Sequence, residues 1–221
     1  MEKMVLVVAT RNQGKSSEIR SYLNHPALEI RDLNDFGPIP EIVEDGNSFD
    51  DNAYKKASFT AKILGFPALA DDSGLEVEAL EGAPGVYSAR YAGENAGDAE
   101  NNAKLLREMV GVTDRRAHFR CVLSLAVPMG FALTYEAHCD GDILSEPRGS
   151  HGFGYDPLFF YPPMRKTFAE LTMEEKLQVS HRGRALMDLQ KELDRVISWL
   201  TKRLAEEKRL RLGDICMHQH G

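Results

Sequence analysis

The sequence predicts an α/β protein with a mixed sheet, and three patterns support this fold class. From the N-terminus to about residue 80, short apolar segments alternate with helical patterns in the order strand, helix, strand, helix, strand. Residues 116–127 then alternate between apolar and polar side chains, as a half-buried strand does. A turn at 128–130 leads into a return strand over 131–139, and such a hairpin adds antiparallel pairing.

Length and composition suit one large domain or two small lobes. The chain has 221 residues, of which 43% are hydrophobic, which is enough for a sizeable core. Its net charge of -7 provides no general attraction to nucleic acid or to an anionic membrane, so an anionic ligand requires a local basic pocket or a metal ion. Three cysteines without CxxC spacing, and no apolar stretch of membrane-spanning length, favour a cytoplasmic protein.

The first strand and the loop after it have a pattern that suits phosphate binding. Residues 4–9 form an apolar run typical of a central strand, residues 10–15 form a polar turn, and residues 16–23 have helical spacing. A strand, a glycine-containing loop and a helix direct backbone N–H groups and a lysine at phosphate. Gly14-Lys15-Ser16 is similar to the end of a Walker A loop, but Ala9 stands where that motif needs glycine. A βα turn with a solvated lysine therefore stays an alternative.

A second strand and a well-defined helix follow. Residues 28–31 are a plausible strand, and residues 34–47 have the prolines and glycines of a loop, with acidic side chains at Glu41, Glu44 and Asp45. Ser48 is a good N-cap for a helix that ends at Gly65. The helix has an apolar stripe, which consists of Ala53, Ala57, Ala61 and Leu64.

The segment Ala68-Leu69-Ala70-Asp71-Asp72-Ser73-Gly74-Leu75 is where the chain combines a buried strand with adjacent carboxylates. An apolar run over 66–70 leads into a predicted turn at Ser73-Gly74, and residues 75–80 alternate as a separate, half-exposed strand. Side chains alternate across a strand, so Asp71 and Asp72 are expected on opposite faces, one as an anchor and one toward a cleft. Such carboxylates suit Mg²⁺ when substrate phosphates supply the other ligands. A solvated turn is the alternative.

The C-terminal half combines helices with a glycine-rich loop. Residues 99–110 have helical spacing, and His118 and His138 lie in predicted strands without the spacing of metal ligands. Residues 149–157 contain glycines among aromatic side chains, which suits a loop close to a flat ligand or, alternatively, a loop whose aromatics belong to the core. A long helix follows, with core positions at Leu186, Leu189, Leu193, Val196, Ile197, Leu200 and Leu204.

Five polar motifs, taken in order, resemble those of the inosine triphosphate pyrophosphatase family. Each motif is weak alone, but all five in order are a specific signal that extends to about Leu200. The motifs are Thr10, Asn12 and Lys15 in Thr-x-Asn-x-x-Lys, Ala70-Asp71-Asp72-Ser73-Gly74-Leu75, Ala83-Pro84-Gly85-Val86-Tyr87-Ser88-Ala89-Arg90, Gly152-Phe153-Gly154-Tyr155-Asp156-Pro157, and Ser180-His181-Arg182-Gly183.

The resemblance implies a two-lobed α/β fold with a long mixed sheet flanked by helices, an active-site cleft between the lobes, and a homodimer. It implies hydrolysis of non-canonical purine nucleoside triphosphates (ITP, dITP and XTP) to the monophosphate and pyrophosphate. The pyrophosphatase domain would span 1–200, and 201–221 would be a basic helical extension and tail. A related pyrophosphatase for other modified nucleotides and a nucleotide-binding regulator without hydrolysis are the alternatives.

The resemblance also implies the site residues. Asp72 would be the general base, and Glu44 and Asp72 would bind Mg²⁺. Asp45 is a possible substitute for Glu44, because the segment Val43-Glu44-Asp45 departs from the usual pattern of the family. The substrate-binding residues would be Thr10, Arg11, Asn12, Gln13, Gly14, Lys15, Lys56, Ser73, Phe153, Gly154, Tyr155, Asp156, Lys176, His181 and Arg182.

Overall fold

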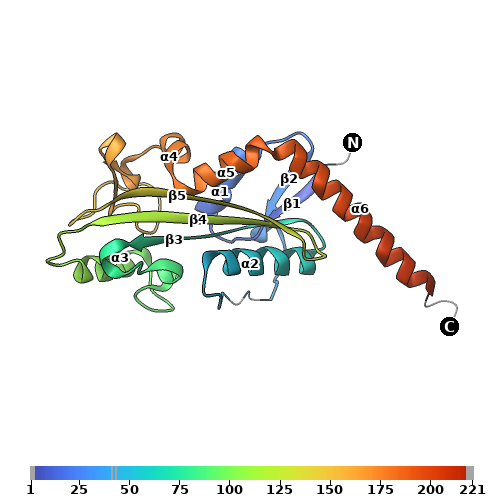
Figure 1. Cartoon of the computed structure of the whole chain (residues 1–221), viewed down its shortest axis with the longest axis horizontal. Helices are drawn as coiled ribbons and strands as arrows, with labels where there is room; N and C mark the ends of the chain where they lie inside the picture. The colour runs from blue at the N-terminus through green and yellow to red at the C-terminus, as the bar shows by residue number, and fades with distance from the viewer. Residues whose placement is uncertain (1–2, 41, 43, 218–221) are drawn as a thin grey trace.

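The computed structural model describes residues 3–40, 42 and 44–217, and it contains a seven-stranded mixed sheet (Figure 1). The strand order is β2-β1-β3-β4-β5-β6-β7; β1 pairs parallel with β2 and β3, and the later pairs are antiparallel. This arrangement confirms the predicted α/β class and mixed sheet. The strands are β1 (Met4–Val8), β2 (Leu28–Asp32), β3 (Ala68–Val77), β4 (Arg116–Ala126), β5 (Ala132–Ile143), β6 (Phe159–Tyr161) and β7 (Lys166–Thr167).

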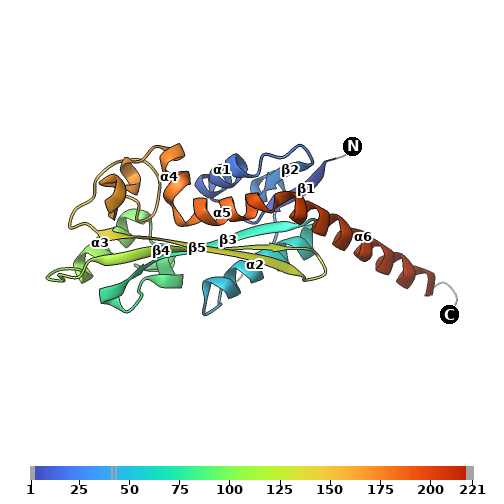
Figure 2. The ribbon, with the colours of Figure 1, turned by 45° about the horizontal axis from the view of Figure 1, so that its top comes forward.

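Helices cover both faces of the sheet (Figures 1 and 2). In both views α1, α4 and α5 lie on one face and α2 lies on the other, while Leu105 and Met109 of α3 pack with Leu75 and Phe119 of the sheet. The α-helices are α1 (Gln13–Tyr22), α2 (Phe49–Leu64), α3 (Asp98–Glu108), α4 (Met173–Val179), α5 (His181–Lys191) and α6 (Leu193–Met217). Short 3-10 turns are η1 (Leu33–Asp35), η2 (Glu78–Leu80), η3 (Gly85–Arg90), η4 (Pro162–Met164) and η5 (Phe168–Glu170).

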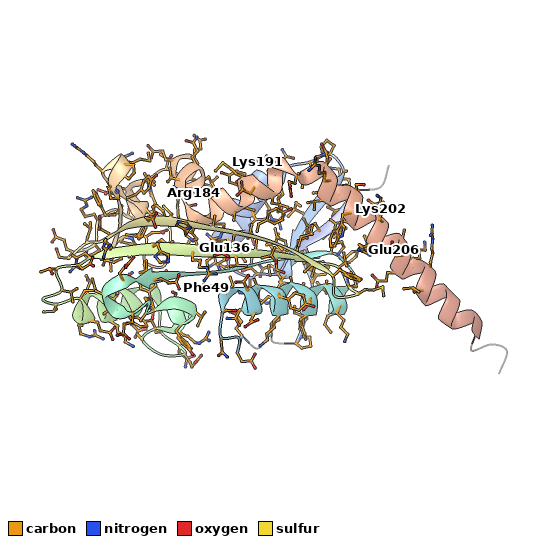
Figure 3. All side chains as sticks on the ribbon, in the orientation of Figure 1. Phe49, Glu136, Arg184, Lys191, Lys202 and Glu206 are labelled. Atoms are coloured by element: carbon orange, nitrogen blue, oxygen red, sulfur yellow. The ribbon has the colours of Figure 1, made fainter. Side chains whose placement is uncertain are left out.

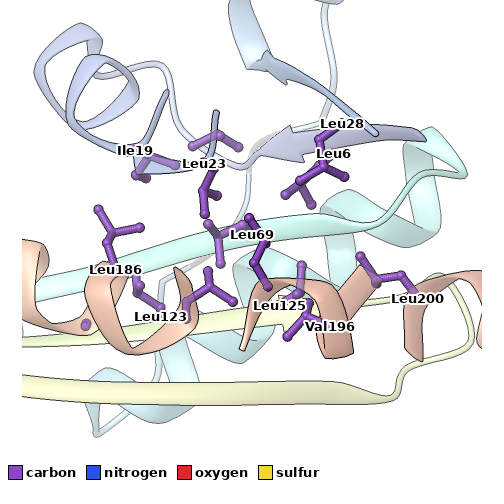
Figure 4. Packing of buried hydrophobic residues seen from close by; sticks show 14 of the residues in the cluster. Leu6, Ile19, Leu23, Leu28, Leu69, Leu123, Leu125, Leu186, Val196 and Leu200 are labelled. Atoms are coloured by element: carbon purple, nitrogen blue, oxygen red, sulfur yellow. The ribbon is translucent and has the colours of Figure 1, made fainter. Parts of the chain in front are cut away.

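The core between the sheet and α1, α5 and α6 is built mainly from leucines (Figure 4). Leu69 of β3 and Leu123 of β4 meet Ile19 of α1 and Leu186 of α5, and all four are almost completely buried. Burying side chains of this size contributes about 1.5–3 kcal/mol each. Leucines of α5 that the apolar spacing predicts as core positions therefore hold this helix over the sheet. The first residues of α5, His181 and Arg182, belong to the predicted site.

The opposite face is packed with small side chains. Ala57 and Ala61 of α2 lie against Ala68 and Ala70 of β3, and all four are fully buried. Alanines let a helix approach a strand closely. Helix α2 therefore lies close enough to β3 for its Lys56 to contact Asp72 of that strand. Phe49, labelled in Figure 3, begins α2, after the N-cap Ser48, whose hydroxyl accepts from the N–H of Asp51. This confirms the predicted cap.

The predicted turn at Ser73-Gly74 is wrong, because β3 continues through it. Ser73 pairs with Cys121 and Gly74 with Arg120 of the antiparallel neighbour β4. Glycine is needed at position 74 because a Cβ there would lie 2.4 Å from the carbonyl oxygen of Gly85. The glycine therefore marks a close approach of two backbones within a strand, and the sequence alone reads the same residue as a turn signal.

Helix boundaries also differ from the prediction at two places. Helix α1 begins at Gln13, three residues before the predicted start, because the Asn12 side chain accepts from the N–H of Lys15 and caps it. The predicted long C-terminal helix is broken at Glu192, whose N–H bonds to the carbonyl of Leu189 in a tighter turn.

Helix α4, which the sequence analysis does not predict, has a readable start signal. Thr172 caps its first turn, and the side chain of Glu175 reaches back to the N–H of Thr172. The Thr-x-x-Glu pattern at 172–175 is a capping box that the sequence does contain.

Helix α6 leaves the body of the molecule and projects past the end of the sheet (Figures 1 and 2). Lys202 and Glu206, labelled in Figure 3, lie on this part of the helix. Arg203 places its guanidinium over the ring of Phe131 at the β4–β5 hairpin, 4.4 Å from the ring centre. The boundary predicted at residue 200 lies within α6, so the division into a domain and an extension stays a prediction. The end of the tail, residues 218–221, lies outside the described residues. Among the described residues, no helix is long and apolar enough to cross a membrane.

Candidate functional site

Two adjoining cavities lie at the site. Their walls come from α1, β3 and η3, and the start of α5 closes the smaller one. The larger has a volume of about 570 Å³ and the smaller about 160 Å³. Asn12, Lys15, Ser73 and Ala89 line both of them, so the two cavities share a wall. A ligand with two chemically different parts can therefore extend from one cavity into the other.

The start of α1 forms one wall of the larger cavity. Thr10, Arg11, Asn12 and Lys15 line it, and the Thr10 hydroxyl accepts from the N–H of Asn12 at 3.1 Å. The helix N-terminus with its lysine is an arrangement that attracts anions. Gln13 and Gly14 are also predicted to bind substrate, but neither residue lines a cavity, and a Cβ at Gly14 would lie 3.0 Å from the ring of Phe153.

Lys56 joins two carboxylates on the floor of the larger cavity. Its ammonium group lies 2.6 Å from Oδ1 of Asp72 and 3.4 Å from Oε2 of Glu44. Burial raises the pKa of Asp72 above its ordinary value, although Lys56 acts in the opposite direction. Two hard oxygen donors thus converge on one point, which fits the donor set of a magnesium ion that takes its remaining ligands from phosphate. Asp45 does not line the cavity and pairs with Lys55 instead.

Asp71 points to the other face of β3, as predicted from strand alternation. It pairs with Lys15 of α1 and with Arg182 of α5, whose Nε lies 2.9 Å from Oδ2 of Asp71. Burial disfavours the charge on Asp71, but Arg182 and Lys15 together hold its pKa well below the ordinary value. The side chains of Ser73 and Cys121 also donate to this carboxylate, at 2.7 and 3.1 Å.

The smaller cavity is lined by rings. His181 stacks on Phe119 with a centroid distance of 4.7 Å and an interplanar angle of 15°. Burial and the neighbouring charge of Arg182 lower the pKa of His181 well below its ordinary value, so the ring is neutral. Its Nδ1 has no hydrogen-bond partner among the described residues, which leaves a polar atom for a ligand. Phe153 lies across the cavity under the ammonium of Lys176, 4.7 Å from it.

A buried chain of alternating charges continues from Arg182. Glu18 of α1 pairs with Arg182 and lies 3.4 Å from Lys176, and Lys176 in turn lies 2.6 Å from Asp156. Burial opposes the charge on Glu18, but Arg182 and Lys176 lower its pKa. Asp156 accepts from the N–H of Phe153 at 2.9 Å, so the chain ends on the loop that carries the aromatic ring.

The backbone between α4 and α5 places His181 and Arg182. Ser180 caps α5 by accepting from the N–H of Gly183 at 3.1 Å. Gly183 cannot carry a side chain, because a Cβ there would lie 1.8 Å from the carbonyl oxygen of Leu177. This close crossing of α4 and α5 explains why the motif ends in glycine.

Helix α3 holds the aromatic loop from the other side. The N–H of Gly154 donates to Asp98 at 2.7 Å, and the Asn102 amide donates to the carbonyl of Gly154 at 2.9 Å. The hydroxyl of the buried Tyr155 donates to the carbonyl of Ser88 at 2.9 Å, so Tyr155 acts as an internal support as well as lining the cavity. Both partners of Gly154 lie four residues apart on one helix face.

The structure brings most of the expected residues together and adds others. Arg11, Thr10 and Asn12 lie with Lys56 and Glu44 at the larger cavity, and Phe153 to Asp156 lie with Lys176, His181 and Arg182 at the smaller one. Sequence reasoning missed Glu18, Asp98 and Asn102. Their only signals are helical spacings, from Lys15 to Glu18 and from Asp98 to Asn102.

His118 and His138 lie away from both cavities. His118 pairs with Glu76 across the strand pair at 2.9 Å, and His138 lies 3.9 Å from Asp140. Within the described part of the chain, no group of three or more His, Cys, Asp or Glu side chains is placed to hold a metal ion by itself.

Comparisons with known proteins identify the family. The Ham1 family model matches residues 6–192. A dITP/XTP pyrophosphatase of Syntrophobacter fumaroxidans is 64% identical over 98% of this chain and 94% of its own length, and one of Desulfotalea psychrophila is 62% identical over 92% of both. Among solved structures, a HAM1 protein from Coxiella burnetii has a TM-score of 0.81 at 42% identity, covering 87% of this chain and 99% of its own. The resemblance found in the sequence is thus confirmed, and the chain belongs to the Ham1 family.

Proposed function

We propose that this protein hydrolyses non-canonical purine nucleoside triphosphates, namely dITP, ITP and XTP, to the monophosphate and pyrophosphate. The observation that carries the proposal is the pair of adjoining cavities with a shared wall at Lys15 and Ser73. The larger offers ammonium groups and carboxylates to a triphosphate, and the smaller offers rings and polar atoms to a base. Relatives that are 64% and 62% identical bear the name dITP/XTP pyrophosphatase, which supports the same substrate class.

Asp72 is the general base of this proposal. A carboxylate with a raised pKa accepts a proton more readily than an ordinary aspartate, and Asp72 lines the larger cavity. It takes a proton from water while the water oxygen forms a bond to the α-phosphorus. The bond from that phosphorus to the bridging oxygen breaks, and pyrophosphate leaves. Lys15 and the N-terminus of α1 stabilise the charge that develops on the leaving group.

Glu44 and Asp72 would hold the Mg²⁺ ion of this proposal. When bound, the ion neutralises negative charge on the phosphate oxygens and lowers the barrier to attack by water. Lys56 then contributes a second positive charge close to both carboxylates. Thr10, Arg11 and Asn12 complete the phosphate side, while Gln13 and Gly14 contribute backbone N–H groups at the start of α1.

The base side discriminates by hydrogen bonding. Hypoxanthine and xanthine present a 6-keto oxygen, whereas adenine presents a 6-amino group. Arg182 uses three of its five N–H groups on Asp71 and Glu18, which fixes the guanidinium and directs the others elsewhere. A keto oxygen accepts from such a donor, and an amino group leaves it unpaired in a buried site, which costs binding strongly. Phe153 supplies a ring for stacking on the base.

The proposal also includes a homodimer in the cytoplasm, acting on a small-molecule substrate and not on nucleic acid or membranes. The resemblance implies the dimer, and the net charge of -7 opposes general binding to nucleic acid. Sedimentation over a range of protein concentrations tests the dimer, and a monomer mass at every concentration contradicts it.

Pyrophosphate release tests the reaction. The substrates are ITP, XTP, dITP, GTP and ATP with Mg²⁺, and Asp72→Asn is the control. We expect a strong preference for the non-canonical 6-keto triphosphates, and loss of hydrolysis in the variant. Tight binding of ITP without hydrolysis would instead favour the nucleotide-binding regulator. Hydrolysis without base preference would keep the chemistry at Asp72 and refute the assignment of the base pocket.

A further inference from the structure

Asp71 is the carboxylate on which groups from both cavities converge. It lies in the middle of β3 with a side chain that is 1% exposed, and its partners come from α1, α5 and β4. Oδ1 receives Lys15 and a guanidinium nitrogen of Arg182 at 3.3 Å. Oδ2 receives Nε of Arg182 at 2.9 Å, the Ser73 hydroxyl and the Cys121 thiol. All of its acceptor sites are therefore used by the protein.

This saturation separates Asp71 from the chemistry assigned to Asp72. A general base needs a free lone pair, whereas the protein already occupies both oxygens of Asp71. By comparison, Lys56 is the only side chain among the described residues that contacts the carboxylate of Asp72. Asp71 is thus placed to orient other groups, and not to exchange protons.

Its two cationic partners serve different parts of the ligand. Lys15 lines both cavities and belongs to the phosphate side, while Arg182 lines only the smaller one and belongs to the base side. Both are held on one carboxylate, so the ammonium and the guanidinium cannot move independently. From Arg182 the buried chain of Glu18, Lys176 and Asp156 then reaches the loop of Phe153.

We propose that Asp71 is a positioning residue that fixes Lys15 and Arg182 relative to one another, so that recognition of the base depends on Lys15 as well as on Arg182. The inference rests on the proposed function and deepens it. Lys15 has no need to touch the base for this effect, because it acts through the shared carboxylate. Selectivity between bases is then a property of the whole buried cluster.

Two lysines give a matched test. Lys15→Met and Lys56→Met each remove one ammonium group from the phosphate side, but only Lys15 contacts Asp71. Both variants should raise KM for every triphosphate. We expect Lys15→Met to lower the ratio of kcat/KM for ITP to that for ATP by about tenfold, the effect of losing one charge-assisted hydrogen bond, and Lys56→Met to leave this ratio within about twofold. Equal ratios in the two variants overturn the proposal.

Asp71→Asn tests the carboxylate itself, with Asp32→Asn as the control. Asp32 is also a buried aspartate paired with an arginine, Arg20, but it lines neither cavity. We expect Asp71→Asn to lower the ITP to ATP ratio by about tenfold while inhibition by inorganic tripolyphosphate is not weakened, because a negative charge has left the phosphate side. Asp32→Asn should change neither quantity.

The readouts separate the possible failures. A partly misfolded variant has fewer active molecules, which lowers the apparent kcat but changes neither the ratio for two substrates nor an inhibition constant. An unchanged ratio in Asp71→Asn, in a wild-type protein that does prefer ITP, refutes the positioning role alone. A wild-type protein that fails to release pyrophosphate from any of the triphosphates refutes the proposed function. If Asp71→Asn does not fold, the pair of lysine variants still decides the question.

Discussion

Replacing Arg182 by methionine tests whether the buried charges contribute to stability. The side chain of Arg182 is 2% exposed and its guanidinium is bonded to both Asp71 and Glu18. Methionine fills much of the volume of the arginine stem but donates no hydrogen bond. Arg182→Met would therefore leave two buried carboxylates that share only Lys15 and Lys176 as cationic partners.

The expected loss follows from breaking a buried ion pair on one side. Removing one partner costs about 3–5 kcal/mol, because the other charge stays buried without full compensation. Arg120→Met is the matched control. Arg120 also pairs with a carboxylate, Glu136, at 2.6 Å, but its side chain is 30% exposed, and pairs of this kind contribute only about 0–1 kcal/mol. The difference between the two variants isolates the effect of burial.

Urea unfolding followed by far-UV circular dichroism measures both variants. The pKa of Asp71 is depressed in the folded state, so its contribution to stability is present above the ordinary pKa of aspartate and is lost as the pH falls through the folded value. The gap between wild type and Arg182→Met should therefore narrow at acid pH. Equal losses for the two arginines, or a gap that widens on acidification, would refute the reasoning.

Three further predictions concern the site and its supports. The pKa of Asp72 is raised when no metal ion is bound, so in NMR titrations of the metal-free protein its carboxyl should titrate above the pH at which an ordinary aspartate does, and this titration should be missing from Asp72→Asn. Gly183→Ala places a Cβ against the carbonyl of Leu177 and should lower the free energy of unfolding by at least about 1–3 kcal/mol in urea titrations. An unchanged free energy of unfolding would contradict the close contact between α4 and α5. Asn102→Leu removes the donor to the carbonyl of Gly154 and should raise KM for ITP several-fold without weakening inhibition by tripolyphosphate; an unchanged KM would deny α3 this role.

The sequence predicts the fold well where a pattern has one physical cause. The strands predicted at 4–9 and 28–31 appear as β1 and β2, and the cap at Ser48 and the β4–β5 hairpin also appear, because burial and capping act locally. The same reasoning fails at Gly74. It looks like a turn residue, but it lies within β3 because the backbone of η3 passes over it, and only the folded chain contains that neighbour.

The candidate site shows a similar limit. The resemblance supplies the residues of the motifs, and the structure places nearly all of them around two cavities. Glu18, Asp98 and Asn102 belong to no motif, because each acts on a partner that is distant in sequence, namely Arg182 for Glu18 and Gly154 for the other two. Helical spacing can place such side chains on one face, but it cannot tell which loop or helix will lie opposite.

The two adjacent aspartates at the centre of β3 have pKa shifts of opposite sign, and strand geometry explains why. Alternation sends Asp71 toward α1 and α5, where Lys15 and Arg182 outweigh the cost of burial and keep it ionised. The same alternation sends Asp72 toward α2, where Lys56 does not outweigh burial and the pKa rises. When their environments separate the pKa values of two neighbouring carboxylates, the two groups can have different roles. A fixed charge for orientation and a proton acceptor for catalysis thus arise from consecutive residues, and a register shift of one residue in β3 would exchange them.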